Sequence, residues 1–187
     1  ERLCKYLDVP LQHASRDVLK RMKRPGDGAY YARLVERARA IVPGIAIRTT
    51  FIVGFPGETE EDFEQLVDLV REARFDRMGV FTYSDEEGTE AFALDGKVDH
   101  EVAEARRARL MEVQREISLE SNRALVGRRV KVLMEGRSEE TDLLLEGRME
   151  SQAPEIDGVV LVNELGDDEH VPEEGEFVTV EITEAHE

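Results

Sequence analysis

The feature that most constrains the fold is a change of sequence pattern close to Gly127. Before this point, short β-branched runs alternate with helical patterns, which is typical of βα units in a parallel sheet. After it, short apolar runs are separated by turns and show no helical period. The sequence therefore predicts an α/β domain over residues 1–127, followed by a small domain of antiparallel strands over residues 128–187.

In the first domain, the apolar spacing predicts three strands and four helices. The strands are expected over 6–11, 45–53 and 78–83, and the helices over segments that begin at Ser15, near Tyr31, after Thr59 and near Asp99. Asp62 lies near the reciprocal capping-box position for Thr59. The buried stripe of the last helix is expected to be Leu110, Val113 and Ile117.

Three strands are fewer than an α/β barrel or an open doubly wound sheet normally contains. The first domain is therefore predicted to be the C-terminal part of a larger α/β domain. In the second domain, strands are expected over 130–134, 143–145, 159–162 and 177–182, with an acidic hairpin loop over 166–176. Such a pattern predicts a small closed or partly open β-barrel.

The charge is unevenly distributed between the two predicted domains. Residues 128–187 hold 5 Lys and Arg against 18 Asp and Glu, a net charge of −13, whereas residues 1–127 hold 20 against 24, a net charge of −4. The total of −17 argues against nonspecific binding to DNA or RNA, because contacts with phosphates need Lys and Arg. A basic partner is favoured.

The cysteine content and the apolar runs exclude further classes. Cys4 is the only cysteine, so a disulfide framework and an iron–sulfur or zinc centre built from this chain alone are excluded. Cys4 precedes a strand that is expected to be buried, and we expect it to be inert. Neither an apolar run of the roughly 18 to 20 residues that span a bilayer nor a signal segment is found. We expect a soluble, cytoplasmic protein with no membrane partner.

Polar residues that follow the predicted strands are the first candidates for chemistry, because function in such folds gathers at the carboxyl ends of the strands. Gln12 and His13 follow the first strand and would offer hydrogen bonds and an imidazole to a ligand, or would cap the next helix. Residues 54–58 follow the second strand as either a ligand-binding turn or a tight turn that needs its glycines. The helix after that turn begins with three acids, which would repel phosphate, so a neutral or cationic ligand suits it better.

Two further positions have open interpretations. Arg48 is a charge on an otherwise apolar strand, which places it in a barrel interior or at an edge. An interior arginine could grip a carboxylate with two hydrogen bonds. The acids at 85–87, after the third strand, would supply a carboxylate pair for acid–base chemistry or would form a solvated loop.

Four segments resemble the later half of a radical-SAM methylthiotransferase: 8–15, 19–22, 48–59 and 79–84. Residues 128–187 resemble the TRAM β-barrel that closes members of that family, so the resemblance covers essentially the whole chain. Residues 12–15, 86–89 and 151–158 are similar to the type that methylthiolates an aspartate of ribosomal protein S-twelve, rather than to the type that modifies tRNA. The fold class implied is the C-terminal part of a partial TIM-type barrel followed by a TRAM-like β-barrel.

The resemblance implies S-adenosylmethionine and two 4Fe–4S clusters, each held by three cysteines, with an electron donor for the clusters. Cys4 matches neither cysteine motif, so neither metal ligands nor catalytic residues are expected in this chain. The family element beside the adenosyl group is partly present: Ile52 and Gly54 match it, and Thr50 stands where it has its first glycine. The cofactor-binding residues expected from the strand ends and the resemblance are Gln12, His13, Arg48, Thr50, Ile52, Gly54 and Phe55.

The expected function is therefore that of part of a longer enzyme, and the chain alone is predicted to be inactive. The expected partner is a basic protein of the small ribosomal subunit, which the acidic TRAM-like domain would dock by charge complementarity. A tRNA partner is disfavoured by the same charge. Two alternatives remain open: a tRNA methylthiotransferase, and an acidic binding module without chemistry.

Overall fold

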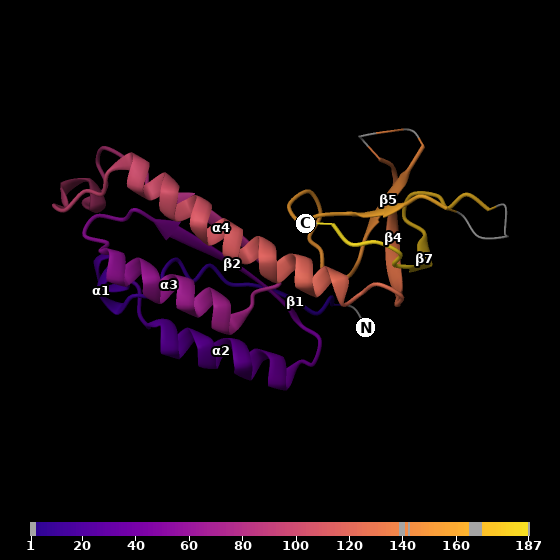
Figure 1. Cartoon of the computed structure of the whole chain (residues 1–187), viewed down its shortest axis with the longest axis horizontal. Helices are drawn as coiled ribbons and strands as arrows, with labels where there is room; N and C mark the ends of the chain where they lie inside the picture. Colours follow the sequence, from indigo (N-terminus) through magenta and orange to yellow (C-terminus); the bar gives the residue numbers. More distant parts are fainter. Residues whose placement is uncertain (1–2, 139–140, 142, 165–169, 187) are drawn as a thin grey trace. The chain divides into compact units, whose positions relative to one another are not determined.

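The computed structural model describes residues 3–138, 141, 143–164 and 170–186. The chain divides into two compact units, one formed by Leu7–Glu120 and the other by Ser121–His186 together with the start of the chain up to Tyr6 (Figure 1). The secondary structure changes from helical to extended between Arg123 and Arg129. The domain boundary expected after residue 127 stays a prediction.

From the start of the chain to residue 123, strands and helices alternate as the sequence predicts. The elements are β1 (Tyr6–Asp8), α1 (Arg16–Arg21), α2 (Gly28–Ile41), β2 (Ala46–Val53), α3 (Glu60–Ala73), β3 (Arg77–Thr82), the 3-10 helix η1 (Glu90–Ala93) and α4 (His100–Arg123). The three strands form one sheet in the order β1-β2-β3, and β2 pairs with β3 in parallel. The α/β class is confirmed.

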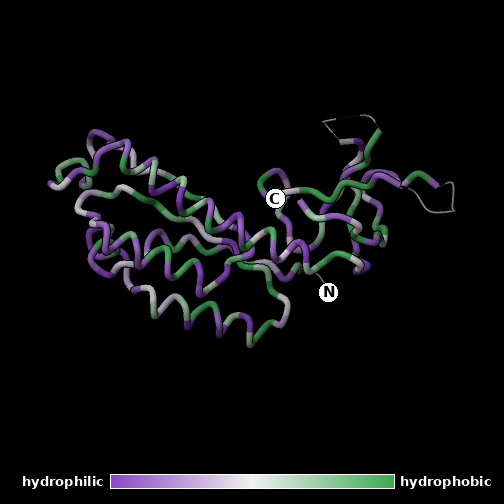
Figure 2. The backbone as a smooth tube through the Cα atoms, viewed as in Figure 1, coloured by the Kyte–Doolittle hydropathy of each residue, from purple (hydrophilic) through white to green (hydrophobic). Residues whose placement is uncertain are grey.

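The helices of this unit begin where side-chain oxygens accept the free backbone N–H groups of the first turn. Ser15 accepts from Asp17 and Val18 at the start of α1. Thr59 and Asp62 form a complete capping box at the start of α3, as the sequence predicts. Hydrophilic and hydrophobic residues alternate along each helix (Figure 2), so that one side of each can be buried.

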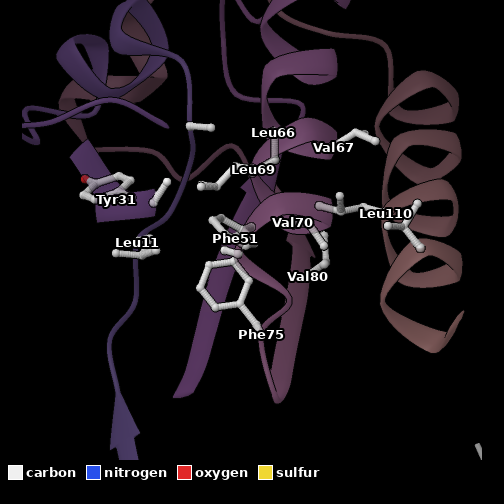
Figure 3. Close-up of a cluster of buried hydrophobic side chains, with 14 of the residues drawn as sticks. Leu11, Tyr31, Phe51, Leu66, Val67, Leu69, Val70, Phe75, Val80 and Leu110 are labelled. Atoms are coloured by element: carbon white, nitrogen blue, oxygen red, sulfur yellow. The ribbon is translucent and has the colours of Figure 1, made fainter. Parts of the chain in front are cut away.

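The core lies between the sheet and its helices. Figure 3 shows Phe51 next to Phe75, with Leu66 of α3 above them and Val70 of α3 and Leu110 of α4 to one side. The rings of Phe51 and Phe75 meet edge to face, with centroids 5.7 Å apart. The predicted stripe of α4 is confirmed, because its three residues are all buried.

The two faces of β2 differ, which matters for function. Ile47, Thr49, Phe51 and Val53 are buried toward the core, while the alternating residues at 48, 50 and 52 are half-buried on the other face. Phe81 of β3 pairs with Ile52 in the parallel register and is 61% exposed. Within the described residues of this unit, the second face of the sheet is therefore left largely uncovered, as expected for a partial barrel.

The start of the chain differs from the prediction. The expected strand 6–11 is shorter, because β1 ends at Asp8 and Gln12 makes a separate bridge to Phe51. No residue of β1 is buried, and Cys4 is exposed as a free thiol rather than leading into a buried strand.

The second unit contains a four-stranded antiparallel sheet in the order β6-β5-β4-β7. Its strands are β4 (Arg129–Arg137), β5 (Leu145–Arg148), β6 (Val160–Val162) and β7 (Phe177–Glu181). A bulge between Met134 and Gly136 shifts the register of β4 against β5, and such bulges bend a sheet. The fold class of an α/β part followed by an antiparallel, partly open barrel is thus confirmed.

Two details of this unit were predicted imperfectly. The strand expected over 143–145 begins only at Leu145, and Leu143 is 89% exposed. Of the predicted acidic loop over 166–176, residues 166–169 lie outside the described residues. Across the described parts of both units, no helix combines the length and apolarity needed to cross a membrane.

Candidate functional site

The candidate site begins where the chain leaves β1 and passes the end of β2. The backbone N–H of Gln12 donates to the carbonyl of Thr50 at 2.9 Å, and the N–H of Ile52 donates to the carbonyl of Gln12 at 2.8 Å. These two bonds hold Gln12 beside β2 in parallel register. Gln12 has a φ of 73°, a left-handed conformation that a residue other than glycine adopts at a cost.

A cavity of about 310 Å³ opens at this carboxyl edge of the sheet. Its lining is formed by the β1 and β2 ends, the end of α1 and the segment around η1, which contribute Gln12, Arg21, Met22, Lys23, Arg24, Ile52, Phe55, Glu90, Ala91 and Leu94. Figure 1 shows α1 at the end of the sheet toward which β2 points. Three of the seven predicted cofactor-binding residues, namely Gln12, Ile52 and Phe55, therefore meet in one cavity.

His13 is not among the residues that line this cavity, and its side chain is completely buried. Its Nδ1 accepts a hydrogen bond from the backbone N–H of Ser15 at 3.0 Å. Its Nε2 lies 3.4 Å from Oε2 of Glu58. With Nδ1 acting as an acceptor, a neutral imidazole carries its proton on Nε2, which faces the Glu58 carboxylate.

Glu58 is the centre of a buried network. Its Oε2 accepts from the backbone N–H groups of Gly54 at 2.8 Å and Phe55 at 3.4 Å, and its Oε1 accepts from Nη1 of Arg106 at 2.8 Å. The side chains of Glu58 and Arg106 are 0% and 9% exposed. We call His13, Glu58 and Arg106 the Glu58 network, and it fixes the turn that carries Phe55 into the cavity wall.

Arg106 did not appear among the residues expected from sequence, although a signal was present. It lies on α4 four residues before Leu110 and three after Ala103, so it belongs to the buried stripe. A charged residue on a buried stripe needs a partner, since burying an unpaired charge is very costly. The partner, Glu58, is 48 residues away in the sequence, so only the structure identifies it.

The acidic side chains around the turn after β2 are bound by an arginine and by hydroxyl groups of this chain. Glu58 and Glu60 both bind Arg106, and Asp62 accepts from the hydroxyls of Ser15 and Thr59. Burial alone would raise the pKa of Asp62, but the hydrogen bonds from Ser15 and Thr59 outweigh it, and the pKa is lowered. None of these acids lines the cavity among the described residues, so they do not supply the negative wall that a cationic ligand would meet.

The other predicted positions have structural partners outside the cavity. Nε of Arg48 lies 3.8 Å from Asp8, on the uncovered face of β2 that also carries Thr50. Gly54 has a φ of +75°, and a Cβ added there would lie 2.5 Å from Cβ of Ala103 on α4. Gly54 is therefore required by close packing of the turn against α4. Ligand binding by all seven residues stays a prediction.

The acidic loop after β3 forms a surface cluster. Asp85 accepts hydrogen bonds from Lys97 and from the hydroxyl of Tyr83. The hydrogen bond from Lys97 is the main reason why the pKa of Asp85 is lowered. Within the described residues there is no group of three or more His, Cys, Asp or Glu side chains that could hold a metal ion. An iron–sulfur cluster therefore does not fit the part of the chain that is described.

Comparison with known families defines the class of protein. Residues 1–70 match the model of the Radical SAM superfamily, and residues 126–187 match that of the TRAM domain. The first match contains strands β1 and β2 of the α/β sheet, and the second contains the whole antiparallel sheet β6-β5-β4-β7. The chain therefore has the organisation of a radical-SAM protein with a TRAM domain.

Within this class, the chain is similar to proteins named ribosomal protein uS12 methylthiotransferase RimO. It is 56% identical to the one from Solibacter usitatus over 184 residues, covering 98% of this chain and 39% of that protein. The RimO of Koribacter versatilis is 53% identical over 185 residues, covering 99% and 36% of the two chains. The resemblance to the RimO-type radical-SAM methylthiotransferases is confirmed.

The chain spans less than two fifths of the length of these relatives. One solved structure that matches is the radical-SAM enzyme coproporphyrinogen III oxidase (HemN) from Escherichia coli. The match covers 63% of this chain and 27% of the HemN chain. That match has a TM-score of 0.43 and 22% identity.

Proposed function

We propose that this chain is the later part of a radical-SAM enzyme that transfers a methylthio group to the β-carbon of an aspartate in ribosomal protein uS12. The observation that carries the proposal is the similarity, over 98% of the chain, to proteins named for this activity. The cavity at the carboxyl edge of the sheet supports it, because active sites of α/β barrels lie at that edge.

The residues of the cavity suit part of S-adenosylmethionine. Ile52 and Phe55 offer apolar surface for a nucleoside, and Gln12 places an amide beside them. Bound there, S-adenosylmethionine would supply the radical chemistry, together with iron–sulfur clusters. The residues of this chain would bind the adenosyl part, hold it in one orientation through the fixed turn at Phe55, and exclude water.

The clusters themselves would be held by the rest of the longer enzyme. The proposal keeps two 4Fe–4S clusters and an electron donor, and it assigns none of their ligands to this chain, whose only cysteine is Cys4. The chain by itself is accordingly expected to be inactive. The place of action would be the cytoplasm, where ribosomal proteins are found.

The second domain would dock the protein substrate. Its net charge of −13 over residues 128–187 favours a Lys- and Arg-rich partner such as a ribosomal protein, and disfavours tRNA. This charge disfavours the first alternative, a tRNA methylthiotransferase. The second alternative, an acidic binding module, has the same charge and differs from the proposal in having no chemistry.

The test is methyl transfer in vitro with the longer enzyme that carries this chain. The enzyme, reduced and supplied with S-adenosylmethionine labelled in its methyl group, is incubated with purified uS12 and, separately, with tRNA. Label is expected in uS12 and not in tRNA. Label in tRNA alone would establish the tRNA alternative, and binding of uS12 without any label would establish the binding module.

A further inference from the structure

Three cationic side chains line the cavity, and two of them are occupied by the protein itself. Arg21 donates to the carbonyl of Pro56 at 3.2 Å and lies 3.6 Å from a carboxylate oxygen of Asp95. Lys23 forms an ion pair with Glu90, which also lines the cavity. These two cations are neutralised locally and serve to connect α1 with the segment around η1.

Arg24 is the third cation, and it differs from the other two. Its guanidinium donates to the carbonyl of Pro10 at 3.4 Å, and no carboxylate of the described residues pairs with it. The side chain is exposed to solvent and lines the cavity. A guanidinium with several unused N–H donors is well suited to a carboxylate, which it can bind with two parallel hydrogen bonds.

The backbone at Arg24 is held by a hydrogen bond at the end of α1, and two other residues of the cavity have a strained backbone. The N–H of Arg24 donates to the carbonyl of Leu19 at 2.8 Å, closing the end of α1. Lys23 has a φ of 57°, and Gln12, which also lines the cavity, has a φ of 73°. Two of the four non-glycine residues with positive φ among those described thus line this one cavity, and backbone strain of this kind gathers at functional sites.

We propose that Arg24 binds the side-chain carboxylate of the substrate aspartate and thereby determines specificity for an acidic residue. The proposal rests on the proposed function, in which the β-carbon of that aspartate is modified. This carbon is bonded directly to the carboxylate carbon, so fixing both carboxylate oxygens fixes the reacting carbon as well. The apolar wall formed by Ile52, Phe55 and Leu94 would keep water away from it.

S-adenosylmethionine also carries a carboxylate, on its methionine part. Arg24 could therefore bind either the carboxylate of the substrate aspartate or that of S-adenosylmethionine. The exposed position of Arg24 favours the protein substrate, because a substrate loop reaches the cavity from solvent. The two sources predict different effects of the same substitution, so one set of binding measurements separates them.

The experiment uses the longer enzyme with Arg24→Ala, Arg24→Lys and, as a matched control, Arg37→Ala. Arg37 is exposed on α2 and does not line the cavity. Calorimetry measures the Kd for a uS12 peptide with the target aspartate, for the same peptide with asparagine there, and for S-adenosylmethionine. Circular dichroism and thermal unfolding establish that each variant is folded.

Arg24→Ala is expected to weaken binding of the aspartate peptide roughly tenfold to a hundredfold, the usual effect of losing a hydrogen bond to a charged group. It should leave the asparagine peptide and S-adenosylmethionine within about twofold of the parent enzyme, as should Arg37→Ala for all ligands. Arg24→Lys should lie between, because lysine keeps the charge but not the two-pronged geometry.

Three results would overturn the proposal. Equal weakening of the two peptides would show that Arg24 does not contact the carboxylate, and weakening of S-adenosylmethionine alone would assign Arg24 to the cofactor. Unchanged affinity of a folded Arg24→Ala enzyme for the aspartate peptide would also contradict it. Failure of the proposed function is distinguished by the labelling assay: if the parent enzyme transfers no label to uS12, the proposed function fails and the inference with it, whatever the binding of the Arg24 variants.

Discussion

At the scale of single residues, the Glu58 network shows how burial and charge are reconciled next to the candidate site. A buried carboxylate is tolerated when it is paired and its oxygens accept hydrogen bonds. Glu58 has one guanidinium, two backbone N–H groups and the His13 ring around it. The guanidinium, the backbone N–H groups and the His13 ring together fix the conformation of the turn after β2. A fixed turn is suited to hold Phe55 in the wall of the cavity.

The first prediction concerns Arg106. Removing its charge by Arg106→Met leaves Glu58 buried without its cation, so the free energy of unfolding should fall by about 3 to 5 kcal/mol. Arg109→Met on the same helix removes ion pairs with Glu64 and Glu60, whose side chains are 44% and 64% exposed. That change should cost no more than about 1 kcal/mol. Urea unfolding of the two variants measures the difference, and equal losses would show that Arg106 has no special role.

The second prediction concerns Gly54. Gly54→Ala adds both backbone strain at φ +75° and a contact 2.5 Å from Ala103, and should destabilise the chain by about 3 kcal/mol. Gly88→Ala provides the control, since Gly88 has a φ of +84° but open space around it, and only the strain of about 1 to 2 kcal/mol applies. Adding Ala103→Gly should restore part of the stability of Gly54→Ala. If both alanine variants lose the same stability, the close approach to α4 is unimportant.

At the scale of elements, much of the first unit could be predicted because its helix starts are local. Ser15 and Thr59 cap helices through contacts within three residues, and the sequence contains all the information needed. The side chain that contacts His13 could not be predicted from local sequence. Its Nε2 faces Glu58, 45 residues further along the chain, and sequence spacing carries no record of that contact.

Strand limits were harder to predict for a related reason. The apolar run at 143–145 satisfies a strand pattern, but β5 begins at Leu145, where it pairs with Arg137 after the bulge in β4. Pairing partners and bulges decide such limits. The cavity was predicted only in part. Gln12 and Phe55 follow from strand ends and Ile52 from the family resemblance, whereas Arg24 and the η1 segment are brought there by the fold.

The third prediction concerns the start of α3. The pKa of Asp62 is lowered in the folded chain, so its ionised form stabilises the fold at pH values above the unfolded pKa, near 4. This contribution is lost as the pH falls through the folded pKa. Asp62→Asn should therefore reduce stability at pH 7 and flatten the dependence of unfolding free energy on pH below about pH 5. A variant that loses stability equally at pH 7 and pH 2.5 would contradict this assignment.

At the scale of the whole molecule, the two parts of the chain divide the proposed work. The α/β part provides a wall of the cavity, and in the proposed function the acidic second domain would attract a basic substrate. The attraction should depend on salt, because exposed charges are screened within about 10 Å at 0.1 M.

The fourth prediction follows from that charge. Affinity of the longer enzyme for uS12 should fall on the order of tenfold when salt is raised from about 0.05 to 0.5 M, mainly through a slower association rate. Binding of S-adenosylmethionine to the same enzyme is the control and should change much less. Affinity for uS12 that is independent of salt would contradict docking by the acidic domain.

The most direct test of the central claim replaces the matching segment of the Solibacter usitatus relative with this chain and determines the mass of uS12 after reaction. The account predicts that the chimera, once reconstituted and reduced, adds one methylthio group to uS12, located on an aspartate by fragmentation. A chimera that folds and binds S-adenosylmethionine, yet leaves uS12 unmodified where the parent relative modifies it, would contradict the account.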